Sequence, residues 1–139
     1  MRQHLEELRI ATGGRGIYEI TREIQAVVGR SELQLGQCTV FCQHTSASLV
    51  IQENADPTAS ADLLAWLERL APRGHSSYTH TAEGPDDMPS HLRSVLTRTS
   101  EVVPVIDGQL ALGTWQGIYI LEHRDVAHTR NIVAQVMGE

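Results

Sequence analysis

The sequence predicts a single α+β domain, residues 1–139, in which two to three helices accompany a mainly antiparallel sheet or sandwich. The chain has 139 residues, 41% of them hydrophobic, which is enough for one domain with one packed core. The strand-like segments gather towards the end of the chain rather than alternating with helices, which disfavours a doubly wound parallel sheet. Two of these segments are joined by Asp107-Gly108, a strong signal for a β-hairpin.

Strands are predicted wherever apolar and polar residues alternate, or where a short apolar run is bounded by turn residues. These segments are 5–11, 36–43, 46–52, 101–106, 109–112, 115–122 and 129–137. Gly13, Gly14 and Gly16 follow the first segment and predict a loop there.

Three helices are predicted, at about 20–29, from Asp56-Pro57 to Ala71-Pro72, and from Pro89 to about Thr97. The second has a clear start, because Asp can cap a helix and Pro fits its first position. Residues 71–88 form a long polar stretch without periodicity. A loop of this length in a small domain is more often functional than idle.

Charge and hydropathy narrow the class of partner. The formal net charge is −6, and the 11 basic residues are all Arg and form no block, so a nucleic-acid partner is not expected. No segment approaches the roughly 20 apolar residues that cross a bilayer. The beginning of the chain also lacks the apolar core of a secretory signal. We therefore expect a cytoplasmic protein that does not interact with membranes.

The two cysteines, Cys38 and Cys42, lie in one predicted strand. Four residues along a strand span about 13 Å, whereas a disulfide needs a Cα separation of about 6 Å. These two cysteines cannot pair within that strand, and they are predicted to be small buried hydrophobic residues.

The first segment with chemical potential contains His44, Thr45 and Ser46, with Asn54 shortly after. It offers an imidazole, hydroxyls and an amide, which can hold a phosphate or a polar ring. The alternative is a polar turn between two strands.

The second segment contains His80, Asp87 and His91, with further acids between them. Imidazoles and carboxylates can bind a divalent metal. The spacing matches no fixed metal motif, so a solvated acidic loop is the alternative.

The third segment runs from Trp115 and Gln116 to Glu122 and Arg124. Trp115 can stack on a planar heterocycle, and Arg124 can bind a phosphate. The alternatives are core packing for Trp115 and a surface salt bridge between Glu122 and Arg124. The remaining histidines in polar surroundings are predicted to face solvent, namely His75, His123 and His128.

Taken together, the three segments resemble the signature blocks of the YjbQ family. The blocks are QHTSASLVIQENADP, EGPDDMPSHLRSVLT and GTWQGIYILEHR, in order and across nearly the whole chain. The resemblance implies an α+β fold, a homotrimer and a secondary thiamine-phosphate synthase activity. That reaction joins a pyrimidine diphosphate to a thiazole phosphate and releases pyrophosphate, so the expected ligand is a small phosphorylated heterocycle.

The resemblance also implies a metal near the shared histidines, which are His44, His80 and His91 here. We expect these three to hold one divalent cation, zinc, with an open position for water or ligand; magnesium is the alternative for a diphosphate substrate. Catalytic roles are assigned to Asp87, Glu122 and Arg124, and substrate binding to Thr45, Ser46, Asn54, Trp115 and Gln116. The competing functions are a metal-dependent phosphate-ester hydrolase and a non-catalytic protein that binds a metabolite or metal.

Overall fold

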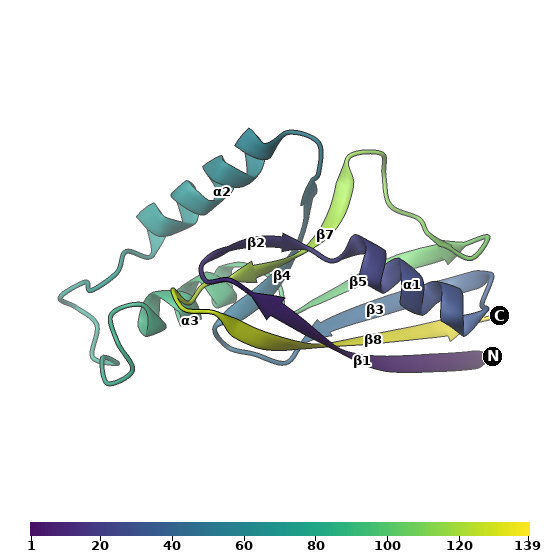
Figure 1. Ribbon diagram of the computed structural model, residues 1–139, viewed down its shortest axis with the longest axis horizontal. Coiled ribbons are helices and arrows are strands. Elements are labelled where there is room, and N and C mark those ends of the chain that lie inside the picture. Colours follow the sequence, from purple (N-terminus) through teal and green to yellow (C-terminus); the bar gives the residue numbers. More distant parts are fainter.

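The computed structural model describes residues 1–139 and contains eight strands and three helices (Figure 1). In chain order the elements are β1 (Arg2–Thr12), β2 (Gly16–Glu19), α1 (Thr21–Ser31), β3 (Leu35–Cys42), β4 (Ala47–Glu53), α2 (Pro57–Leu70), α3 (Asp87–Leu96), β5 (Ser100–Ile106), β6 (Gln109–Leu110), β7 (Gln116–Glu122) and β8 (His128–Gly138). None of the three helices combines the length and apolar character needed to cross a lipid bilayer.

The strands form two sheets, and every strand pair is antiparallel. The larger sheet has the order β1-β8-β3-β5-β6 and the smaller one β2-β7-β4. β1 and β8 pair along their full lengths, from Arg2 opposite Gly138 to Thr12 opposite His128. This pairing brings the two chain ends together at one end of the molecule (Figure 1). The prediction of an α+β fold with antiparallel sheets is confirmed.

The hydrophobic core lies against one face of the larger sheet. Its 17 buried residues come from α1, both sheets and the adjoining turns. Ile24, Val27 and Val28 of α1 are fully buried, as the helical spacing of that segment predicts. In β8 alternate residues are buried, so the strand presents one face to the core and the other outward.

The structure departs from the predicted elements in two places. Residues 16–19 form β2, which pairs with β7, where the glycines predicted only a loop. Tyr18 closes the preceding turn, because its hydroxyl donates to the Gly14 carbonyl at 2.7 Å. Helix α3 begins at Asp87 rather than at Pro89. Proline is tolerated there because the backbone N–H groups in the first turn of a helix have no intrahelical acceptor, so the N–H that proline lacks breaks no helical hydrogen bond.

The turn between β5 and β6 confirms the predicted hairpin. Asp107 and Gly108 have φ angles of 52° and 74°. Positive φ at both central residues is characteristic of the type I′ turn, which matches the twist of the flanking strands.

Helices α2 and α3 frame the end of the molecule opposite the chain termini (Figure 1). Asp56 caps α2, because its Oδ1 accepts the backbone N–H of Thr58 at 2.9 Å. The chain then runs through a long loop, residues 71–86, before entering α3. This loop and the start of α3 position the candidate site.

Candidate metal centre

Three side chains converge where the long loop meets α3. His80 comes from the loop, while Asp87 and His91 lie four residues apart on α3 and therefore on the same face of that helix. One potential ligand atom from each residue lies within 4.8 Å of the others. The Asp87 side chain is only 2% exposed, whereas those of His80 and His91 are 43% and 30% exposed. The centre thus has a buried carboxylate and two imidazoles that solvent can reach.

One oxygen of Asp87 faces both imidazoles. Its Oδ2 lies 2.6 Å from Nε2 of His80 and 3.0 Å from Nε2 of His91. Nδ1 of His91 lies 2.9 Å from the carbonyl oxygen of Thr45, which can only accept, so this nitrogen carries the proton and donates. In the neutral ring, Nε2 of His91 then presents a lone pair to the carboxylate. Such an arrangement requires a cation or a proton between the two atoms.

The donor set fits a divalent metal. Two imidazoles and a carboxylate suit zinc and related ions. The bond from His91 to the Thr45 carbonyl is the kind of outer contact that commonly fixes the tautomer of a metal-binding histidine. With three protein ligands, a coordination position stays open for a further ligand.

Arg124 holds the acidic side of this centre in place. Its Nη1 donates to Oδ1 of Asp87 at 2.8 Å and its Nε to Oδ2 of Asp86 at 2.9 Å. Its Nη2 donates to the carbonyl oxygen of Glu83 at 3.0 Å. The guanidinium, expected to bind phosphate, is therefore already engaged with protein oxygens.

These contacts also set the charge of the carboxylates. Burial by itself raises the pKa of Asp87, but hydrogen bonding to His80 and Glu83 and the nearby charge of Arg124 outweigh it, so the pKa lies below its usual value. The same opposition of burial and hydrogen bonding, here from Arg124, lowers the pKa of Asp86. Both residues are carboxylates at neutral pH.

The structure does not bring His44 into this group. The backbone N–H of Asn131 donates to its Nε2 at 2.7 Å, which leaves the proton of a neutral ring on Nδ1. Nδ1 lies 3.4 Å from Nη1 of Arg130. Burial, together with the charge of Arg130, lowers the pKa of His44. Within this chain, both ring nitrogens of His44 have protein neighbours other than the centre.

Glu122, for which a catalytic role was expected, lies in a separate buried network. Its side chain is fully buried and pairs with Nη2 of Arg130, whose side chain is only 4% exposed. Arg130 Nε donates to Oε1 at 2.7 Å, and the Thr12 hydroxyl donates to the same oxygen at 2.6 Å. Glu122 and Arg124 form no side-chain salt bridge; only the backbone N–H of Arg124 donates to Glu122, at 3.2 Å.

The five residues expected to bind substrate are divided between two places. Thr45 contacts the centre through its carbonyl oxygen, which faces His91, whereas its neighbour Ser46 accepts hydrogen bonds from Arg130 of the Glu122 network. The other three are Asn54, Trp115 and Gln116. They lie at the start of β7, whereas Glu122 ends it, and its seven residues span about 20 Å. Trp115 is 64% exposed, so it is not a core residue.

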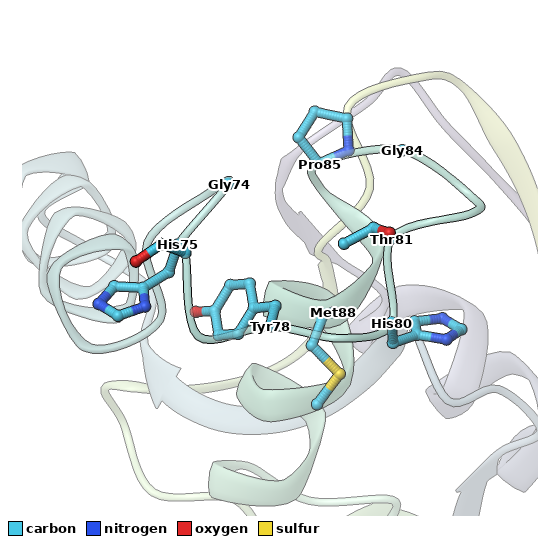
Figure 2. A pocket seen from close by; sticks show the side chains of 9 residues that line it. Gly74, His75, Tyr78, His80, Thr81, Gly84, Pro85 and Met88 are labelled. Atoms are coloured by element: carbon cyan, nitrogen blue, oxygen red, sulfur yellow. The ribbon is translucent and has the colours of Figure 1, made fainter.

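A cavity of about 430 Å³ lies within the long loop, next to the centre. Figure 2 shows His75 and Tyr78 on one side, Thr81 and Pro85 on the other, and Met88 of α3 at its base. The imidazole of His80 points away from Tyr78 in this view, and His80 belongs both to the wall of the cavity and to the centre.

Three polar residues that support this end of the molecule were not predicted from the sequence. Asp86 and Arg130 become partners of Arg124 and Glu122 only through contacts between distant segments. His123 was expected to face solvent, and this prediction is wrong: the residue is 1% exposed. Its Nε2 lies 2.8 Å from the Ser48 hydroxyl. Ser48 lies on β4, the neighbour of β7, so only the strand pairing reveals the contact.

Comparison with known proteins identifies the family. Residues 6–139 match the family model described as UPF0047 protein YjbQ-like. The chain is 51% identical over 138 residues to the UPF0047 protein sll1880 of Synechocystis, covering 99% of this chain and 94% of that protein. It is 40% identical to the UPF0047 protein YjbQ of Escherichia coli O157:H7, covering 95% and 96%. The chain therefore belongs to the UPF0047 (YjbQ-like) family.

Solved structures are similar over nearly the whole chain. A YjbQ/UPF0047 family protein from Clostridium acetobutylicum aligns with a TM-score of 0.88 at 32% identity, covering 95% of this chain and 99% of that one. The conserved hypothetical protein TT1486 from Thermus thermophilus aligns with a TM-score of 0.85, also at 32% identity and with the same coverage. The arrangement of two sheets and three helices is thus that of the family.

Proposed function

We propose that this protein is a metal-assisted transferase with thiamine phosphate synthase activity, and that its reactive centre is the group His80, Asp87 and His91. The observation that carries the proposal is the single Asp87 oxygen that faces two imidazole nitrogens at 2.6 and 3.0 Å. The substrates follow from the likeness of the sequence blocks to the YjbQ family: a pyrimidine diphosphate and a thiazole phosphate.

Some of these side chains would bind the ion, and others hold the ion-binding side chains in position. A bound divalent cation, zinc by the donor set or magnesium with a diphosphate, would supply a Lewis acid for the charge that develops on the departing pyrophosphate. Asp87 supplies negative charge, and Arg124 keeps it ionised and oriented. Thr45 fixes the ring of His91. His80 is the most exposed member of the group, so a ligand could reach it from solvent.

A phosphate-ester hydrolase is the second candidate. The observation that favours it is the exposure of His80 and His91, which leaves the centre accessible to water. The same residues would serve, with water rather than the thiazole as the attacking group. Substrate trials distinguish these two functions, since the transferase needs both heterocycles and the hydrolase needs one ester.

The experiment combines zinc titration with product analysis. We expect His80→Ala, Asp87→Asn and His91→Ala each to lower zinc affinity and to abolish formation of thiamine phosphate from the two heterocycles. His4→Ala, the same substitution on β1 at the other end of the molecule, is the matched control and should change neither. Unchanged zinc affinity in all three variants refutes the centre. Zinc binding with ester hydrolysis but no thiamine phosphate assigns the hydrolase instead.

We also propose that the protein is a homotrimer, as the family resemblance implies. The outer face of the larger sheet supports self-association, since it carries large apolar side chains that are 45–63% exposed. These are Leu5, Leu35, Phe41, Val102 and Ile106. The register places Leu35 opposite Ile106 on neighbouring strands, so the two form one patch. Sedimentation equilibrium at micromolar concentration measures the state, and a stable monomer would contradict the proposal.

A further inference from the structure

Two further cavities lie on the other side of His91 and form one groove. One, of about 310 Å³, is bounded by His91 and Ser94 of α3, and the other, of about 590 Å³, by the end of β3. His44, Thr45 and Thr99 belong to the walls of both cavities. We call the combined space the His44 groove. His91 forms part of its wall and also belongs to the metal centre, so the groove and the centre adjoin.

The wall of the His44 groove contains no carboxylate and no guanidinium. It offers hydroxyls, an amide and imidazoles, and these come from Gln43, His44, Thr45, Ser46, Ser94 and Thr99. Val95, which is 81% exposed, adds apolar surface at its rim. The guanidinium of Arg130 contacts His44 and Ser46 from behind the wall, but it is buried and paired with Glu122. An ionic group placed in the groove would therefore lose water without gaining a free counter-charge, whereas a neutral polar group would keep its hydrogen bonds.

Ser94 provides an independent sign that this wall can hold a ligand. The residue is 8% exposed, and its hydroxyl is buried without a hydrogen-bond partner. Buried polar atoms in folded proteins nearly always have a partner. A ligand that carries a hydrogen-bonding group into the groove can supply one here.

His44 is held in one protonation state beside this wall. The Asn131 N–H occupies its Nε2, and burial disfavours a charge on the ring. The imidazole therefore adds a neutral, fixed dipole to the wall, which fits the absence of charged groups from the rest of the groove.

We infer that the His44 groove binds the uncharged, hydrogen-bonding part of the ligand, such as a planar amide-bearing or hydroxyl-bearing ring, while the anionic part lies at the metal centre. The inference rests on the proposed function only for the anionic part. It assigns substrate selection to Ser94, Thr99 and the exposed Val95, none of which belongs to the metal centre.

The test uses two probes that share a ring and differ in charge, nicotinamide and nicotinate. Each is titrated into zinc-free ¹⁵N-labelled protein, in which no bound cation can hold the carboxylate of nicotinate, while backbone amide shifts are followed. We expect nicotinamide to move the amides of Thr45, Val95 and Thr99 saturably, and nicotinate to bind about tenfold more weakly. Equal binding of the two probes, shifts centred elsewhere, or no saturable shift would overturn the inference.

Matched variants locate the probe in the groove. Val95→Trp should fill the groove and weaken nicotinamide at least about tenfold, whereas Val126→Trp, at another exposed valine, should leave binding unchanged. Ser94→Ala should also weaken it, since it removes the unpartnered hydroxyl. If Val95→Trp and Ser94→Ala both bind as the unmodified protein does, the inference fails.

Zinc titration of the same samples separates this inference from the proposed function. Zinc binding without nicotinamide binding refutes the groove and leaves the metal centre standing. Nicotinamide binding without zinc binding refutes the metal centre and leaves the groove standing.

Discussion

Replacing Glu122 by Gln tests whether this carboxylate supports the structure or takes part in the reaction. The glutamine has nearly the same shape but no charge, so Arg130 would remain buried without its counter-charge. The two side chains are 0% and 4% exposed, so water cannot replace the lost partner. Removing one member of a buried ion pair typically costs about 3–5 kcal/mol. That is a large share of the roughly 5–15 kcal/mol by which a domain of this kind is stable.

The assay is urea denaturation followed by activity per folded molecule. We expect Glu122→Gln to lose about 3–5 kcal/mol of unfolding free energy. Glu68→Gln is the control, because its pair with Arg15 is 3.5 Å long and half-exposed, and it should change stability by less than about 1 kcal/mol. Combining Glu122→Gln with Arg130→Met should cost less than the sum of the two single changes. A loss below about 1 kcal/mol, or a stable variant without activity, would refute the structural role.

Three further predictions follow from the same contacts. Arg124→Met should weaken zinc binding about 10- to 100-fold, because Asp87 loses the group that orients it; unchanged affinity in a calorimetric titration would contradict this. Burial lowers the pKa of His123 from 6.5 to about 3. The unfolded chain therefore takes up the proton first, and stability present above pH 6.5 should fall by on the order of 4–5 kcal/mol as pH drops towards 3. His123→Gln should flatten that slope in urea titrations at several pH values, and an unaltered slope would exclude His123 as its source. Joint replacement of Cys38 and Cys42 by serine should keep activity and lower stability by about 1–3 kcal/mol for each hydroxyl without a partner. Inactivity of the folded double variant would instead place the thiols in the reaction.

Local sequence patterns predicted most of the fold because they reflect which side of each element is buried. The pattern of residues 129–137 predicted the strand β8, and the helical spacing within residues 20–29 predicted α1. β2 was missed because it has only four residues and depends on β7 for its hydrogen bonds. A strand this short, between glycines, carries too little periodicity to be distinguished from a loop.

Residue chemistry identified the candidate centre only in part. The imidazoles and acids of the second segment made a metal site conceivable, and the resemblance to the YjbQ family then pointed to His80 and His91, together with His44. The burial of His123 was not predicted, because the polar neighbours Glu122 and Arg124 suggested an exposed segment. In the fold both neighbours find partners from distant parts of the chain, Arg130 and Asp86 respectively. A charged residue in a sequence therefore indicates an exposed segment only where the fold brings no oppositely charged partner to it.

Proximity in sequence has different consequences on a strand and on a helix, and this explains which predicted residues meet. Asp87 and His91 are four apart on α3, so their side chains share a face and come within 3.0 Å. Gln116 and Glu122 are six apart on β7, where each residue adds about 3.3 Å, so they occupy opposite ends of the strand. The two ends of the sequence block that contains Trp115 and Glu122 therefore lie in two separate regions of the structure. The predicted helix began only at Pro89 and left Asp87 outside it, so the contact between Asp87 and His91 became apparent only from the fold.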